Sequence, residues 1–220
     1  MRVSFFVLGF AVAGLGLAAS NAQANSAGAN RYIEFRNDND FWVPGGTDRY
    51  YTNGLFAKVI YPGEGPWWPG FMDDVLAFAG GCGADGEDCT SKSRGYGINQ
   101  YMFTPRDITE TAFIPTDHPY AGYLSLSALY FADKLGASGC KTFGDCVFNE
   151  FEAQLGVIGE ESLAGKVQVW WHTQVLNIDR PNGWAHQLKD SVGGTLRMKR
   201  AWPVRQDILS GLTLELAPYA

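Results

Sequence analysis

The sequence predicts an all-β fold built from antiparallel strands. Aromatic residues make up 14% of the 220-residue chain and charged residues only 18%, a composition more typical of β-structure than of helical bundles. Several segments alternate apolar and polar residues with a period of two, which indicates strands with one apolar and one charged face. Two architectures fit this alternation. In a soluble sandwich the apolar face would form the core, whereas in a membrane barrel it would contact lipid.

The first residues predict a secretory signal peptide. Met1 and Arg2 precede an apolar run from Phe5 to Ala19, and Ala22-Gln23-Ala24 provides a small-residue exit, so we expect a signal peptide at 1–24 and one domain at 25–220. No later stretch approaches the roughly 18 apolar residues of a spanning helix. Export then leads to the periplasm, the outer membrane or the medium. The net charge of −6 argues against a nucleic-acid partner.

The strands are expected in seven segments, and the connections between them fall at two ends. In the first segment Ile33 and Phe35 oppose Glu34 and Arg36, and the later segments repeat this pattern. The predicted strands are at about 31–37, 50–61, 95–104, 120–132, 147–158, 191–201 and 207–217. With a periplasmic N-terminus, the connections 38–49, 105–119 and 159–190 are extracellular, and 62–94, 133–146 and 202–206 are periplasmic. A short helix is predicted at Met72–Ala79.

The four cysteines and the last strand carry two further expectations. Cys82 with Cys89, and Cys140 with Cys146, form two short-range pairs, which we expect to be disulfides in an oxidising compartment. Their spacing matches no zinc signature. Seven strands is an odd number, and an apolar last strand would leave an open edge, so we expect either that the sequence is incomplete at its C-terminus or that the barrel closes by another route.

An oxygen-rich stretch from Asn37 to Gly54 concentrates polar side chains. Its carboxylates, amides and hydroxyls suit calcium, but the same residue types are ordinary in turns, and the two interpretations stay open on composition alone. The polar residues of this stretch are Asn37, Asp38, Asn39, Asp40, Asp48, Arg49, Thr52 and Asn53.

A second candidate cluster follows the fifth predicted strand. The segment from Gly159 enters a predicted helix in which Gln168 and His172 are four residues apart and therefore share one helix face. A single histidine near aromatic residues is more often packed than catalytic. Asp117-His118-Pro119 is more typical of a turn than of a catalytic pair. The sequence has no G-x-S-x-G motif, which argues against a serine hydrolase.

Taken in order, these motifs resemble a known family, the outer-membrane lipid A deacylases that remove the acyl chains at the 3′ position (LpxR-type enzymes). The motifs that carry the resemblance are Asn37-Asp38, Tyr51-Thr52-Asn53-Gly54-Leu55, Asp117-His118-Pro119-Tyr120-Ala121-Gly122, and Gly156-Val157-Ile158-Gly159 through Gln168 to His172. The resemblance implies a twelve-stranded antiparallel transmembrane barrel in the outer membrane, of which about seven strands are present here. It also implies an active site between the barrel wall and a short helix of an extracellular loop, calcium dependence, and a lipid A or lipopolysaccharide substrate.

Carried over residue by residue, the resemblance implies a role for each site residue. His172 becomes the general base, Asp38 a calcium ligand, and Asn37, Thr52 and Gln168 the groups that orient water or stabilise the oxyanion. Ester hydrolysis without a nucleophilic serine needs such a base and such donors, and calcium would act as a Lewis acid. One departure is Glu160, where the family usually has proline. The alternative is a non-catalytic barrel with a structural or lipopolysaccharide-binding role, and the oligomeric state stays open.

Overall fold

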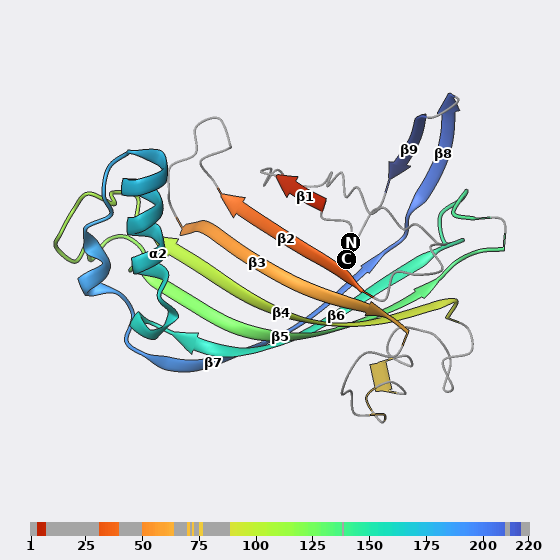
Figure 1. Cartoon of the computed structure of the whole chain (residues 1–220), viewed down its shortest axis with the longest axis horizontal. Coiled ribbons are helices and arrows are strands. Elements are labelled where there is room, and N and C mark those ends of the chain that lie inside the picture. Colours follow the sequence, from red (N-terminus) through yellow and green to blue (C-terminus); the bar gives the residue numbers. More distant parts are fainter. Residues whose placement is uncertain are drawn as a thin grey trace.

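The computed structural model describes residues 4–7, 31–39, 50–63, 70, 72, 75–76, 89–137, 139–209 and 212–216. Its main element is a seven-stranded sheet in the order β1-β2-β3-β4-β5-β6-β7, which Figure 1 shows as a curved gutter. All neighbours from β2 to β7 pair antiparallel. The strands are β1 (Ser4–Val7), β2 (Tyr32–Asn39), β3 (Tyr50–Pro62), β4 (Ser91–Thr104), β5 (Ala121–Lys134), β6 (Val147–Ile158) and β7 (Ser191–Ala201), followed by β8 (Val204–Leu209) and β9 (Leu212–Leu216).

Six of the seven predicted strands are confirmed, as β2 to β7. The prediction of one strand over 207–217 is wrong, because β8 and β9 form a separate antiparallel pair. Ser210-Gly211, a dipeptide typical of turns, separates these two strands in the sequence. Of the predicted helix Met72–Ala79, the described residues Met72, Val75 and Leu76 are helical, and the rest lies outside the described residues. Strand β1, which pairs parallel with β2, lies inside the predicted signal peptide. Cleavage of that peptide stays a prediction.

The convex face of the sheet, here called the outer face, is apolar and exposed. One row of paired residues crosses six strands, from β2 to β7, without a charged side chain. Leu126 in this row is 68% exposed, and Leu196 in the neighbouring row is 87% exposed. The row consists of Phe35, Ala57, Ile98, Leu126, Leu155 and Gly194.

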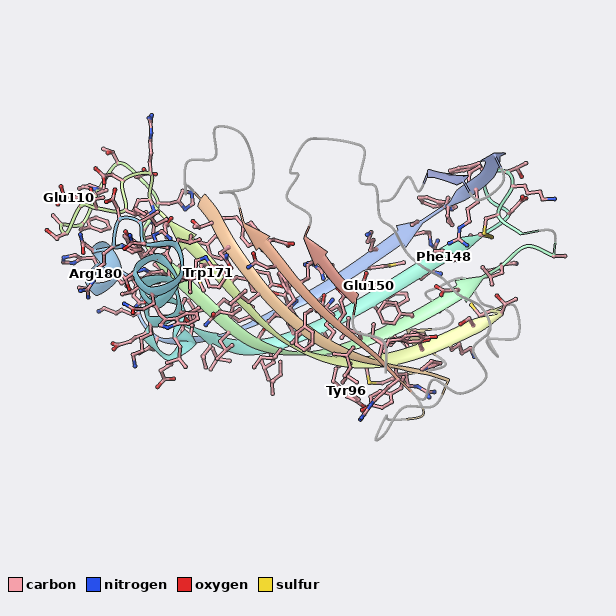
Figure 2. The ribbon with its side chains drawn as sticks, turned by 45° about the horizontal axis from the view of Figure 1, so that its top comes forward. Tyr96, Glu110, Phe148, Glu150, Trp171 and Arg180 are labelled. Atoms are coloured by element: carbon pink, nitrogen blue, oxygen red, sulfur yellow. A yellow bond between two sulfur atoms is a disulfide. The ribbon has the colours of Figure 1, made fainter. Side chains whose placement is uncertain are left out.

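The concave face, here called the inner face, carries charged side chains, and two of them are almost fully buried. Lys58 and Glu152 are only 5% and 2% exposed. Figure 2 shows Glu150 on the concave side and Tyr96 on the convex side. Exposed leucines combined with buried charges invert the arrangement of a soluble sandwich and match a membrane barrel, whose outside contacts lipid. The sheet is therefore a barrel wall.

The described residues do not complete that barrel, because β7 pairs only with β6 among the described strands. Within the described part of the chain, no helix is long and apolar enough to span a membrane.

Hydrogen bonds between connections confirm that they sort onto two ends of the sheet. Asn182 donates its backbone N–H to the carbonyl of Ile108 at 2.8 Å, so the connections 105–119 and 159–190 meet at one end. At the other end Arg205 donates its backbone N–H to the carbonyl of Cys140 at 2.6 Å. The predicted Cys140–Cys146 disulfide is present. Cys89 is also disulfide-bonded, and its predicted partner Cys82 lies outside the described residues.

Candidate active site

A short helical segment places Gln168 and His172. Helix α2 (Ala164–Trp170) continues directly into the π-helical turn η3 (Trp171–Leu176). Ala164, Gln168 and His172 follow each other at intervals of four and are all buried, so they lie along the covered face of this segment. The predicted sharing of one helix face is therefore confirmed.

The covered face of α2 rests on the outer face of the sheet, at the end where β4 stops and β5 begins (Figure 1). Gln100 of β4 donates its side-chain N–H to the carbonyl of Ser162 at 2.7 Å, just before the helix. Any side chain at Gly122 of β5 would overlap Ser162 and Ala164, so glycine is what allows this close approach. Met102, Tyr120, Ala164 and Trp184 form the buried cluster between helix and sheet.

A β-bulge brings Thr52 to this same place. The register of β3 against β4 shifts between Tyr51 and Asn53, so Thr52 is an extra residue without a partner in the register. Its hydroxyl lies 2.6 Å from the hydroxyl of Thr104, and the pair is buried. Asn53, the next residue, pairs with Met102, which packs under α2.

Asn37 reaches the site from β2, but Asp38 does not share its face. The Asn37 amide nitrogen donates to Oδ1 of Asn53 at 3.4 Å, which leaves the Asn37 carbonyl oxygen as an acceptor. Asp38 instead lies on the inner face, where Oδ1 is 3.2 Å from Nε of Arg36 and Oδ2 accepts a 3.5 Å hydrogen bond from Tyr51. Four of the five predicted residues thus lie at the end of the sheet that α2 covers, either on the outer face or in the helical segment that packs on it. Asp38 faces the interior.

The described residues alone do not assemble a calcium site. Among them no group of three or more His, Cys, Asp or Glu side chains could hold a metal. Asp38 is a single carboxylate already paired with Arg36, whereas calcium takes six to eight oxygen ligands. The other carboxylates of the oxygen-rich stretch, Asp40 and Asp48, lie outside the described residues together with Arg49.

His172 is held in one tautomer. Its Nδ1 lies 2.8 Å from the carbonyl oxygen of Asp179, which can only accept, so Nδ1 carries the proton. In the neutral ring Nε2 then holds the lone pair. The backbone carbonyl of His172 also accepts from the N–H of Ile178 at 3.0 Å, where the π-turn ends. An oriented, buried imidazole with one basic nitrogen suits a general base.

Gln168 is held by its oxygen. The indole N–H of Trp184 donates to Gln168 Oε1 at 2.8 Å, and Nε2 has no hydrogen-bond partner among the described residues although it is buried. The two N–H groups of this amide are therefore the ones available to a bound molecule.

The family model described as outer membrane protein LpxR matches residues 6–220. The chain belongs to the LpxR family. Among solved structures, LpxR from Salmonella typhimurium shares the fold with a TM-score of 0.50 and 18% sequence identity. The alignment covers 78% of this chain and 47% of the Salmonella protein, so the chain spans about half the length of that relative. No curated protein matches the sequence.

Membership of the LpxR family assigns the chain to the outer membrane, in agreement with the exposed apolar outer face.

His118 lies in the connection 105–119, where Asp117 accepts the backbone N–H groups of Arg106 at 3.0 Å and His118 at 2.8 Å. Asp117 therefore holds a turn, as its sequence context predicted. A cavity of about 610 Å³ opens beside this turn, and none of the five predicted site residues lines it.

Sequence reasoning missed the partners that hold the predicted residues in this LpxR-family chain. Asn53 was already among the polar residues of the oxygen-rich stretch, but its contact with Asn37 was not predicted. Thr104, Trp184 and the Asp179 carbonyl give no signal in the sequence, since their contacts depend on the β4 register and on the path of the 159–190 connection.

Proposed function

We propose that the full-length protein hydrolyses the 3′-linked acyl ester of lipid A in the outer leaflet. The observation that carries the proposal is the placement of His172. Its Nδ1 is hydrogen-bonded to the backbone carbonyl of Asp179, and the ring is buried beside the outer face. The apolar rows of that face end where Asn37 and Gln100 introduce polar groups. Such a boundary is the depth at which lipid acyl chains meet the headgroup, and so the depth at which an acyl ester would be reached.

The proposed reaction uses water and the side chains around α2. His172 Nε2 accepts a proton from the water as its oxygen attacks the ester carbonyl carbon. The imidazolium that forms then gives its proton to the sugar oxygen as the carbon–oxygen bond breaks, which returns the base to its starting state. Gln168 Nε2 donates to the carbonyl oxygen as it becomes negative. The Asn37 carbonyl and the Thr52 hydroxyl orient the water.

Calcium is part of the proposal through Asp38 and the oxygen-rich stretch that follows it. The support is the chemistry of the donors, since carboxylate and amide oxygens are the ligands that calcium prefers. Asp38 faces the interior, so a calcium ion that acts on the ester as a Lewis acid would need further oxygen ligands of this stretch on the outer side.

Mass spectrometry of lipid A from cells that express the full reading frame tests the proposal. The wild type is expected to release the 3′-linked chains, and the release should stop on addition of a calcium chelator and return with calcium. His172→Ala should abolish release while the protein keeps its heat-modifiable folded form. His186→Ala, an exposed histidine of the same connection, is the matched control and should behave as wild type.

Full release by the His172→Ala variant would refute the assignment of the base. An unchanged lipid A mass in cells that carry the folded wild type would instead favour the alternative, a non-catalytic barrel with a structural or lipopolysaccharide-binding role.

A further inference from the structure

Trp184 makes the one described side-chain hydrogen bond to Gln168, and this bond fixes which end of the amide is free. The oxygen and nitrogen ends of a glutamine amide are identified by their hydrogen-bond partners. An indole N–H is a donor only, so the atom 2.8 Å from Trp184 Nε1 has to be the amide oxygen. The Gln168 nitrogen and its two protons therefore point away from Trp184.

The free end of Gln168 is the unusual part. The side chain is 3% exposed, and within the described residues Nε2 has no hydrogen-bond partner. A buried N–H without a partner is unfavourable, so such groups generally mark a bound molecule or water. Gln168 lies one helical turn from His172, whose ring has one hydrogen bond within the described residues, from Nδ1 to the backbone carbonyl of Asp179. Both residues keep one polar end for something outside the described chain.

Trp184 is itself held in place by packing contacts. It belongs to the 3₁₀ turn η4 (Gly183–His186) and packs on the ring of Tyr120, with centroids 4.9 Å apart. A side chain at Gly165 would come within 2.8 Å of the Trp184 ring, so glycine lets the indole lie flat against α2. Tyr120 in turn donates its hydroxyl to the carbonyl of Ile108 at 3.0 Å.

From these contacts we propose that Trp184 is a positioning residue for catalysis: its N–H holds the Gln168 oxygen so that the Gln168 amide protons face the developing oxyanion. The inference rests on the proposed ester hydrolysis. Without the indole N–H the amide could rotate by half a turn and present its oxygen, which would repel a negatively charged oxyanion. Trp184 acts on the reaction only through Gln168.

The test replaces Trp184 by Phe, which keeps an aromatic ring and removes the N–H. Removal of one oxyanion donor typically lowers kcat by about 100-fold or more, and partial misorientation should lower it by about 10-fold, with KM changed less than about 3-fold. Trp202→Phe, the same chemical change at the other end of the sheet, should leave kcat at the wild-type value. A Trp184→Phe variant that keeps kcat within about 2-fold of wild type overturns the proposal.

Two further variants separate positioning from packing. Gln168→Glu keeps an acceptor for Trp184 but has no amide protons, so it should lose as much kcat as Gln168→Ala. In the Gln168→Ala background, Trp184→Phe should cause no further loss of kcat, because Gln168 is the only route by which Trp184 acts. A second, multiplicative loss in the double variant would show a direct structural role and overturn the proposal.

A measurement without substrate keeps this inference separate from the proposed function. In ¹⁵N-labelled protein in detergent, the two Nε2 protons of Gln168 should give distinct, exchange-protected signals that average or broaden in Trp184→Phe. Gln168 signals that are unchanged in Trp184→Phe refute the positioning role even if lipid A is hydrolysed. Loss of the signals together with an inactive wild type would instead reject the proposed function and retain the hydrogen-bond control of Gln168.

Discussion

The ammonium group of Lys58 in β3 lies 3.7 Å from the carboxylate of Glu152 in β6, although two strands separate them. The register places Gly97 of β4 and Ser127 of β5 beside Lys58 on the inner face. A side chain at Gly97 would come within 2.6 Å of the Ser127 hydroxyl and 3.1 Å of Lys58 Cγ, so the small residues leave the path open. Glu150 at 3.6 Å from Lys58, and Arg197 against Glu152, complete the charge cluster.

Replacement of Lys58 by Met is expected to destabilise the folded protein by about 3 kcal/mol, because it leaves the buried carboxylate of Glu152 with Arg197 as its one remaining cation among the described residues. Urea unfolding in lipid vesicles, monitored by tryptophan fluorescence, measures the free energy of unfolding. Lys134→Met, an exposed lysine at the end of β5, is the control and should change it by less than about 0.5 kcal/mol. Equal effects of the two variants would mean that the cluster does not stabilise the barrel.

Leu196 and Thr195 are neighbours on opposite faces of β7, and arginine should affect them differently. Leu196→Arg places a charge on the outer face and is expected to cost about 2–4 kcal/mol in a bilayer, whereas Thr195→Arg extends into the polar interior. The same vesicle unfolding experiment measures both. In water, an 87% exposed Leu196 would tolerate arginine, so a harmless Leu196→Arg would contradict the lipid-facing assignment.

Gly122→Val should displace α2 without unfolding the sheet. Valine favours strands, so β5 is expected to persist, but the added side chain overlaps Ser162 and Ala164. The expected result is loss of lipid A deacylation and faster proteolysis within 159–190, with the heat-modifiable form retained. Ala121→Val, one residue earlier on the opposite face, should show neither change.

Asp145 should give a pH response at the other end of the sheet. Its carboxylate accepts the hydroxyl and the backbone N–H of Thr142, both at 2.7 Å, and these bonds lower the pKa of Asp145. A lowered carboxyl pKa stabilises the Cys140–Cys146 loop above the ordinary aspartate pKa of about 4, and the effect is lost as pH falls through the pKa of the folded state. An NMR titration of the Asp145 carboxyl carbon should show a higher pKa in Thr142→Val. An unchanged midpoint would contradict the role of Thr142.

The sequence predicted the strands well because alternation is a local signal, and Leu196 beside Arg197 shows it within two residues. It could not decide which face was inside, because that depends on the curvature of the paired sheet. It also placed a strand across β8 and β9, since apolar alternation runs through both. Alternation therefore predicted the β-strands, and the resemblance to the outer-membrane deacylases was what indicated that the apolar face meets lipid.

In the candidate site, too, local relations could be predicted from the sequence and long-range contacts could not. Gln168 and His172 could be related because they are four apart on one helix. The bond from Trp184 to Gln168 spans 16 positions, and the contact between Thr52 and Thr104 spans 52. Contacts of that kind come from packing and register, which neither composition nor periodicity contains.

The bulge at Thr52 divides β3 into two parts that assign their side chains to the faces independently. On the C-terminal side of the bulge, strict alternation places Lys58 on the inner face and Leu55 on the outer face. On its N-terminal side, the alternation of side chains between the two faces is shifted by one residue. Tyr51 therefore faces the interior, while Thr52 lies beside Asn53 on the outer face. Deletion of Thr52 would join Tyr51 directly to Asn53 and give one continuous alternation, in which Tyr51 still faces the interior but the outer-face hydroxyl beside Thr104 is lost. The extra residue therefore lets two consecutive polar side chains, Thr52 and Asn53, share the outer face, which strict alternation would not allow.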